Sequence, residues 1–297
     1  MDLSIQGLKE AFEKEGYISE DEIVLTVYLA LKLEKPLLIE GAAGVGKTEI
    51  AKVLSKVFNT ELIRLQCYEG LDENKALYEW NYQRQLIKIQ VSKETVQDEE
   101  LERNLFSREY LLERPLLRAI QAEKRPVLLI DEIDKTDEEF EAFLFELLSD
   151  FQISIPELGT LTARQIPIVV LTSNNERELS DGLKRRCVYL YIDYPSVEKE
   201  VRIINARVPE AGAVLAREIS TAVNYIRSNL ETKKNPSIAE TLDWARALVA
   251  LEADRLSPAL IKQTLNLVLK HRDDLQGFQE RIGAEGLYDY IISASQK

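Results

Sequence analysis

The chain has 297 residues, of which 45% are hydrophobic and 30% charged, a balance that excludes a disordered or fibrous protein. Its formal net charge of −13 disfavours nucleic-acid binding, because a phosphate backbone would be repelled unless basic residues cluster on one surface. Two cysteines without a CxxC pair and one histidine leave no usual zinc site. No apolar stretch reaches the roughly 20 residues that cross a bilayer, and no signal-peptide pattern is present, so we expect a cytoplasmic chain without membrane contact.

Five segments have the pattern of buried strands. Continuous apolar runs, which suit strands covered on both faces of a parallel sheet, occur at residues 37–39, 127–130, 168–171 and 188–192. A half-alternating run at residues 62–65 gives the fifth strand.

Helical periods separate these strands. Apolar residues at i, i+3, i+4, i+7 and i+8 predict helices that include residues 50–58 and 140–148. Strands that alternate with helices predict a doubly wound α/β layer.

Three helix starts are predicted from capping residues. Ser19 with Glu22, and Thr136 with Glu139, each have the spacing of a capping box. Ser257 is expected to cap a third helix, with proline at its first position.

The pattern changes after residue 194. Strand-like runs stop there, and helical periods such as residues 215–226 and 261–268 follow. The sequence therefore predicts an α/β domain at residues 1–194 and a smaller all-α domain at residues 195–297.

The segment after the first strand fits the phosphate-binding pattern GxxxxGK[ST]. Its glycines let backbone N–H groups surround phosphates, while Lys47 reaches the outer phosphates and Thr48 binds Mg²⁺. A glycine-rich helix entry that binds nothing is the alternative, and the strand before and the helix after argue against it. The residues expected to contact the nucleotide are Gly41, Ala42, Ala43, Gly44, Val45, Gly46, Lys47, Thr48 and Glu49.

Two adjacent carboxylates end the strand at residues 127–130. We expect Asp131 to bind Mg²⁺ and Glu132 to activate the attacking water. An acidic turn at a helix entry is the structural alternative, and it is less common beside a phosphate loop.

Polar residues also mark the ends of two further strands. Asn174 is predicted to orient water or touch the terminal phosphate, although asparagine there is also a common turn residue. Arg185 and Arg186 precede the last strand, where one of them could act on a neighbouring subunit's nucleotide as an arginine finger. The alternative for the pair is a solvated basic corner.

In this order and spacing, the elements resemble the AAA+ superfamily, and within it the MoxR-like branch, including variants associated with carbon monoxide dehydrogenase maturation. The resemblance spans nearly the whole chain and includes residues 65–82, 153–160 and 177–187. It implies a P-loop AAA+ core in which a parallel sheet lies between helices, and an all-α lid domain. It further implies an insert at about residues 68–114 and a hairpin at about residues 151–163, before the strand that leads to Asn174.

The resemblance also implies a function. The expected cofactors are ATP and Mg²⁺, and the expected assembly is a homo-oligomeric ring, typically a hexamer, in which Lys47, Glu132, Asn174 and the arginine pair are catalytic. The implied role is that of a chaperone that remodels a protein client, with a partner containing a von Willebrand factor A domain. Two other classes stay open, a nucleic-acid motor or restriction-type NTPase and a nucleotide-gated scaffold that does not hydrolyse.

Two segments depart from or extend this pattern. Many relatives carry an arginine near the start of a lid helix, whereas residues 236–240 contain none, and Arg246 is the nearest candidate. In the insert, Tyr78, Trp80 and Tyr82 would share one face of a strand, either as a small local core or as a surface that grips a partner. The acidic residues 94–102 suit a solvated helix face.

Overall fold

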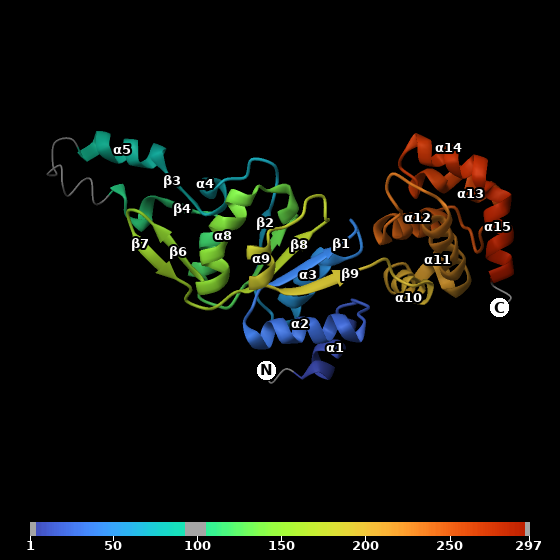
Figure 1. Cartoon of the computed structure of the whole chain (residues 1–297), viewed down its shortest axis with the longest axis horizontal. Coiled ribbons are helices and arrows are strands. Elements are labelled where there is room, and N and C mark those ends of the chain that lie inside the picture. The colour runs from blue at the N-terminus through green and yellow to red at the C-terminus, as the bar shows by residue number, and fades with distance from the viewer. Residues whose placement is uncertain (1–3, 93–104, 295–297) are drawn as a thin grey trace. The chain divides into compact units, whose positions relative to one another are not determined.

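The computed structural model describes residues 4–92 and 105–294. Within them, a central five-stranded sheet has the order β2-β5-β8-β1-β9. Its strands β2, β8, β1 and β9 are labelled in Figure 1. The register is parallel for β2 with β5, β5 with β8, and β8 with β1. Each of the predicted strand segments belongs to this sheet, so the predicted α/β fold with a parallel sheet is confirmed. The strands are β1 (Leu37–Gly41), β2 (Leu62–Gln66), β5 (Val127–Asp131), β8 (Ile168–Ser173) and β9 (Val188–Ile192).

The central strands are buried on both faces. Every residue of β1, β5 and β8 is buried, whereas β2 and β9 at the edges alternate between buried and accessible positions. One face packs with α7 (Pro115–Gln121) and α8 (Glu138–Asp150) in a core that includes Leu38, Leu128 and Val169. Neighbouring side chains along a strand point to opposite faces, which explains the continuous apolar runs.

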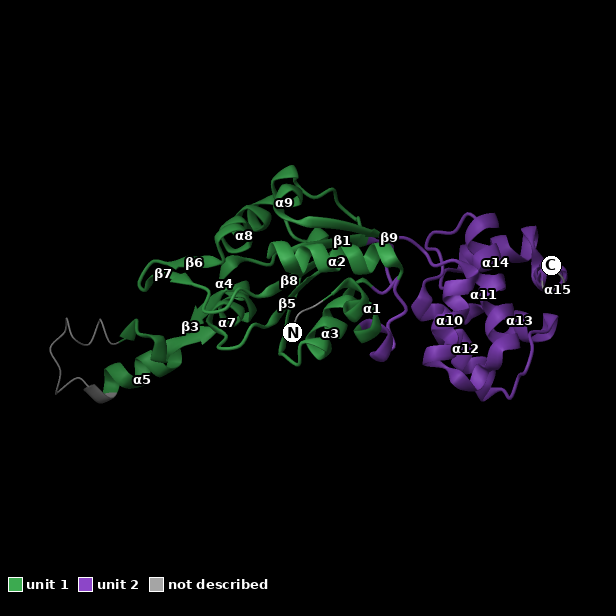
Figure 2. Cartoon of the chain, turned by 90° about the horizontal axis from the view of Figure 1, so that it is seen from below, with its two compact units in different colours: residues 1–11, 20–40, 47–191 green, residues 12–19, 41–46, 192–297 purple. Residues whose placement is uncertain are grey.

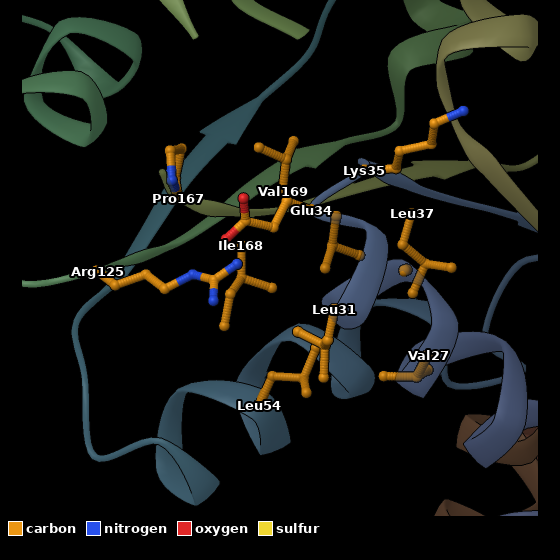
Figure 3. Close-up of a pocket in the computed structure, with 12 residues that line it drawn as sticks. Val27, Leu31, Glu34, Lys35, Leu37, Leu54, Arg125, Pro167, Ile168 and Val169 are labelled. Atoms are coloured by element: carbon orange, nitrogen blue, oxygen red, sulfur yellow. The ribbon is translucent and has the colours of Figure 1, made fainter. Parts of the chain in front are cut away.

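The other face is covered by α2 (Asp21–Leu33) and α3 (Lys47–Val57). Val27 of α2 and Leu54 of α3 gather with Leu37 and Ile168 of the sheet (Figure 3). Helix α3 contains most of the period predicted at residues 50–58, and its Ile50 and Leu54 are buried. α1 (Ile5–Lys14) precedes these elements in the chain.

Short elements between β2 and α7 form the insert. They are α4 (Glu73–Ala76), β3 (Tyr78–Trp80), α5 (Tyr82–Ser92), the 3-10 turn η1 (Arg108–Tyr110) and β4 (Leu111–Glu113). β3 and β4 pair antiparallel, with Trp80 opposite Leu111. A second antiparallel pair, β6 (Gln152–Ile155) and β7 (Gly159–Thr162), forms a hairpin before β8.

The prediction that three aromatic residues of the insert share a strand face is wrong for one of them. Tyr78 and Trp80 lie on β3 and are 9% and 6% exposed, but Tyr82 is the first residue of α5 and is 62% exposed. The chain turns because the Asn81 side chain accepts a hydrogen bond from the backbone N–H of Arg84 at 3.0 Å, which caps the new helix. The acidic stretch at residues 94–102 lies outside the described residues.

Two of the three predicted helix starts are also wrong. Helix α8 is capped by Asp137, which accepts from the N–H of Phe140 at 2.8 Å, while the Thr136 hydroxyl donates to the carbonyl of Ile133. The 3-10 turn η2 (Ile133–Lys135) shifts the start of the helix by one residue.

At the other site, Ser19 is buried and lies before Glu20, the residue that occupies the N-cap position of α2. The third prediction is confirmed, because Ser257 accepts from the N–H of Leu260 and Pro258 opens α13 (Pro258–Thr264).

The chain divides into two compact units, shown in Figure 2. One contains residues 1–11, 20–40 and 47–191, and the other contains residues 12–19, 41–46 and 192–297. The domain division at residue 194 stays a prediction, and the observed units differ from it mainly in two short segments, residues 12–19 and 41–46.

The second unit is built from helices around a buried core. Trp244 and Phe278 are the largest side chains at its centre, and the indole N–H of Trp244 donates to the Thr264 hydroxyl at 2.7 Å. None of the described helices is long and apolar enough to cross a membrane. Besides α13, the elements are α10 (Val197–Arg207), η3 (Pro209–Ala211), α11 (Gly212–Asn229), α12 (Ile238–Ala250), η4 (Leu265–Leu267), α14 (Arg272–Arg281) and α15 (Gly283–Ala294).

Candidate active site

Polar residues that follow neighbouring parallel strands meet at one edge of the sheet. Asp131 ends β5, Asn174 directly follows β8, and Lys47 opens the helix after β1. Because the carboxyl ends of parallel strands lie at the same edge, these residues come together although they are far apart in sequence.

Lys47 is buried at this edge. Its ammonium donates to the side-chain oxygen of Asn174 at 2.8 Å, and the residue is 5% exposed. Burial lowers the pKa of Lys47 from its ordinary value, and the carboxylates of Asp134, Asp131 and Glu132 act in the opposite direction. The contact brings together two residues that the sequence analysis assigned separately.

The oxygens of Thr48 and Asp131 lie close enough for both to reach one divalent cation. The Thr48 hydroxyl donates to Asp131 Oδ1 at 3.1 Å. Adjacent ligands of an octahedral Mg²⁺ ion, each about 2.1 Å from the metal, lie about 3 Å apart. These two hard oxygens therefore fit one Mg²⁺ ion.

Further contacts hold the Asp131 carboxylate in place. Its Oδ1 also accepts from the Thr172 hydroxyl at 2.5 Å, and its Oδ2 pairs with the Arg64 guanidinium. Both partners were missed in the sequence analysis. Arg64 lies on β2, the strand that pairs with β5, so pairing the two predicted strands would have placed it beside Asp131.

Glu132 has an unusual backbone conformation. Its φ of 59° and ψ of 50° lie in the left-handed region, which costs a non-glycine residue roughly 1–2 kcal/mol. A hydrogen bond from its N–H to the Thr172 hydroxyl, at 3.0 Å, holds this conformation. Such strain is found preferentially at functional sites.

The Glu132 side chain has two partners. Its Oε2 accepts from Gln66 Nε2 at 2.9 Å and from Lys135 Nζ at 2.6 Å. The hydrogen bond to Glu132 raises the pKa of Lys135. Gln66, at the end of β2, is another residue that the sequence analysis missed.

Asp134 fixes the segment that presents Asn174. Its Oδ2 accepts from the backbone N–H of Asn174 at 3.0 Å and from that of Glu176 at 2.9 Å. The residue is 4% exposed, so these bonds form in a dry environment. Its position three residues after Asp131 was the available signal for a role in the site.

The two arginines before β9 are not equivalent. Both end α9 (Asp181–Arg186), but Arg186 donates to Ser149 Oγ and to the carbonyl of Gly182, each at 2.8 Å. Its guanidinium also lies 4.1 Å from the ring centre of Phe145. Arg185 is exposed and forms no hydrogen bond or ion pair with any residue that the structure describes. Neither arginine contacts the Lys47, Asp131 and Glu132 group in the described parts of the chain.

The phosphate-loop segment requires glycine. Gly44 and Gly46 have φ values of +76° and +98°, which other residues rarely adopt. A Cβ on Gly44 would lie 2.3 Å from the hydroxyl oxygen of Ser237. Ser237 caps α12 through a capping box with Glu240. Arg246, the nearest candidate for a lid arginine in the sequence, pairs with Asp243 at 3.0 Å on an exposed surface.

A small pocket lies at the opposite end of the strands (Figure 3). Its lining includes Lys35, Arg125 and Pro167, which precede β1, β5 and β8. The space available to water is about 10 Å³, which is roughly that of one water molecule. This pocket is therefore too small for a nucleotide.

The fold and the segment at residues 41–48 define the class. A parallel sheet flanked by helices, followed by a helical part, is the arrangement of a RuvB-like AAA+ fold. Residues 36–187 match the family model described as AAA domain (dynein-related subfamily), and the chain belongs to this family.

One similar protein is itself uncharacterized. The chain is 28% identical over 189 residues to the uncharacterized protein SH1500 of Staphylococcus haemolyticus (strain JCSC1435), a match over 61% of this chain and 64% of that protein. The chain thus spans less than two thirds of that relative's length.

Solved structures of a Thermotoga maritima protein share the fold. The RuvB Holliday junction branch migration motor aligns with a TM-score of 0.52 and 17% identity, over 91% of this chain and 72% of that one. A point mutant of the motor aligns with a TM-score of 0.51 and 19% identity, over 94% and 83%. At this identity, the likeness shows the fold alone.

Proposed function

We propose that the chain is a Mg²⁺-dependent ATPase of the MoxR-like branch. The observation that supports this best is the meeting of Lys47 with Asn174 and of Thr48 with Asp131, next to Glu132. Lys47 and the backbone N–H groups of residues 41–49 would hold the phosphates of ATP, and Thr48 and Asp131 would hold the metal. Bound Mg²⁺ supplies positive charge to the phosphate oxygens.

In this proposal, Glu132 accepts a proton from the attacking water. Gln66 and Lys135 both bind Oε2 of this carboxylate, so Oε1 can accept the proton of a water while both contacts are kept. The side-chain oxygen of Asn174 accepts a hydrogen bond from Lys47, the residue proposed to bind the outer phosphates. This position suits a residue that orients water near the terminal phosphate. The αL backbone of Glu132 sets the direction in which its side chain leaves the sheet.

We assign the trans-acting role to Arg185 rather than to Arg186. Arg186 contacts Ser149, Gly182 and Phe145 of its own chain, whereas Arg185 is an exposed residue. A finger from a neighbouring subunit requires such a side chain and an oligomeric ring, for which the family resemblance suggests a hexamer.

The proposed output of ATP turnover is the remodelling or activation of a protein client. The support is the resemblance to the MoxR-like branch, which also suggests a von Willebrand factor A domain partner and a client undergoing metalloenzyme maturation. A nucleic-acid motor is disfavoured by the net charge of −13. A non-hydrolysing scaffold would not need Glu132.

Steady-state phosphate release separates binding from hydrolysis. Lys47→Ala should lose ATP binding, while Glu132→Gln should bind ATP and release phosphate about 10² to 10⁴ times more slowly. Glu139→Gln, a change at an exposed glutamate of α8, is the matched control. Turnover by Glu132→Gln equal to that of the control would contradict the proposal. Mass spectrometry of proteins retained by the ATP-loaded Glu132→Gln variant would identify the client.

A further inference from the structure

A second cavity lies away from the candidate active site, in the insert. It opens to solvent, has a volume of about 540 Å³, and is lined by α4, β3, the start of α5 and the turn between β6 and β7. This volume is within the range of ligand-binding pockets, roughly 300–1,000 Å³. The phosphate-binding segment, Asp131 and Glu132 do not line it.

Two largely buried aromatic residues, Tyr78 and Trp80, line this cavity, and each carries a hydrogen-bond donor without a partner among the described residues. Tyr78 and Trp80 are 9% and 6% exposed and pack edge to face with ring centres 5.9 Å apart. In the described part of the chain, neither the Tyr78 hydroxyl nor the Trp80 indole N–H has a hydrogen-bond partner. Neither atom is among the fully buried side-chain atoms that lack a partner, so both are open to the solvent in the cavity, whereas the indole N–H of Trp244 is bound to Thr264. The cavity is the space from which a ligand carbonyl can reach these two donors.

The charged side chains that line the cavity favour a cationic ligand over an anionic one. Asp72, Glu79 and Glu157 line the cavity against a single ammonium, that of Lys75, which is bound to Asp72 at 3.1 Å. Glu79 pairs with Arg114. An anionic ligand is therefore disfavoured.

Glu157 is the carboxylate that is available to a ligand. It is exposed in the β6–β7 turn and has no ion pair among the described residues. Glu157 and Tyr78 line the same cavity, and the pKa of Tyr78 is raised first by burial and then by the negative charge of Glu157.

The exposed ring of Tyr82 completes the mouth of the cavity. Its side chain is 62% exposed at the first position of α5. A tyrosine face within about 6 Å of a lysine or arginine attracts the cation, and carboxylates nearby strengthen this preference.

We propose that this cavity binds a lysine or arginine side chain on an extended segment of a protein partner. Glu157 pairs with the cation, Tyr82 stacks on it, and Tyr78 and Trp80 donate to the backbone carbonyls of the segment. An extended peptide supplies both a cation and carbonyl acceptors, which a free metal ion or a nucleic acid does not. Only the description of this partner as a client or an adaptor rests on the proposed function. The binding of a lysine or arginine side chain in the cavity does not depend on it.

Tryptophan fluorescence of the full chain tests this site directly. The chain has two tryptophans, and Trp244 is fully buried in the second unit, so a ligand in the cavity changes the emission of Trp80. The probe is the blocked peptide acetyl-Gly-Gly-Arg-Gly-Gly-amide, and its control has citrulline, a neutral arginine isostere. We expect a saturable change with the arginine peptide and binding at least about fivefold weaker with citrulline, as for the loss of one charge pair.

Two variants assign the contacts. Glu157→Gln should weaken binding of the arginine peptide about fivefold, and Tyr82→Ser by a similar factor. Glu123→Gln, whose side chain is 89% exposed elsewhere in the first unit, should bind as the wild type does. Circular dichroism of each variant checks that it folds.

Two results would overturn the proposal, namely equal binding of the arginine and citrulline peptides, or unchanged binding by a folded Glu157→Gln variant. Binding is measured without ATP, and ATP turnover is assayed separately on the same samples. If peptide binding fails while ATP turnover is retained, the cavity proposal is wrong. If ATP turnover fails while peptide binding is retained, the proposed ATPase function is wrong.

Discussion

The sheet edge and the insert cavity use their polar groups in opposite ways. At the sheet edge, the side chains of Lys47, Asp131 and Glu132 each have a partner within the chain. In the insert cavity, the donors of Tyr78 and Trp80 have none among the described residues. The polar side chains of the first region are therefore held by other residues of the chain, whereas the two donors of the second are free to bind a ligand. The two regions should therefore respond differently to substitution.

The largest expected effect concerns the arginine pair. Arg185→Ala should lower ATP turnover of the assembled protein about 10³-fold or more, because a finger in trans contributes that much. Arg186→Ala should chiefly destabilise the chain, since it removes contacts to Ser149 and to the Phe145 ring. Phosphate release at saturating protein concentration and thermal melting of both variants measure the two effects. If Arg185→Ala and Arg186→Ala lost the same fraction of ATP turnover and had the same melting temperature, the two arginines would not have the different roles assigned to them.

A substitution in the insert should lower stability and leave the candidate active site intact. Trp80 packs edge to face with Tyr78 and with Phe106, at 5.9 and 5.3 Å, so Trp80→Ala should lower the free energy of unfolding by about 3–5 kcal/mol. Tyr82→Ser, at an exposed position, should change it by less than about 0.5 kcal/mol. Urea unfolding followed by circular dichroism gives both values. A large loss for Tyr82→Ser would show that its ring belongs to the local core.

Asp134 should influence the site through Asn174. Asp134→Ala leaves the N–H groups of Asn174 and Glu176 without their acceptor, so Asn174 loses its fixed position. We expect turnover to fall about 10- to 100-fold while ATP binding falls less, which separates positioning from a general loss of folding. Glu139→Ala is the control. An equal fall in turnover and in ATP affinity would argue against a positioning role.

The smallest effect should come from Gln66. Gln66→Ala removes one of the two hydrogen bonds to the Glu132 carboxylate and should raise basal turnover by less than about fivefold, the equivalent of one hydrogen bond. Phosphate release without any partner protein measures it. A fall of tenfold or more would mean that Gln66 holds Glu132 in its productive position.

The sequence predicted the parts of this fold that local patterns encode. Apolar runs located β1, β5 and β8 because those strands are buried on both faces, and the GxxxxGK[ST] pattern located Lys47 and Thr48 between a strand and a helix. These features depend on near neighbours in the chain.

Features that depend on pairing between distant segments escaped prediction. Thr172 and Gln66 bind Glu132 from segments 40 or more residues away, so no local motif marks them. The capping errors have a different cause. Thr136 and Asp137 are both good caps, and the 3-10 turn before them decides in favour of Asp137.

The strand order also determines how firmly the candidate catalytic residues are anchored. β1, β5 and β8 lie inside the sheet, and the segments that carry Lys47, Asp131 and Asn174 begin at their ends. Amides of such central strands exchange with solvent deuterium only when the whole unit opens, while those of edge strands exchange through local fraying. Mass spectrometry should therefore find the slowest exchange in the strands that lead to the candidate catalytic residues and faster exchange along β2 and β9. Sequence changes along β9 should therefore disturb the candidate site less than changes along β2, because β2 carries Arg64 and Gln66, the partners of Asp131 and Glu132.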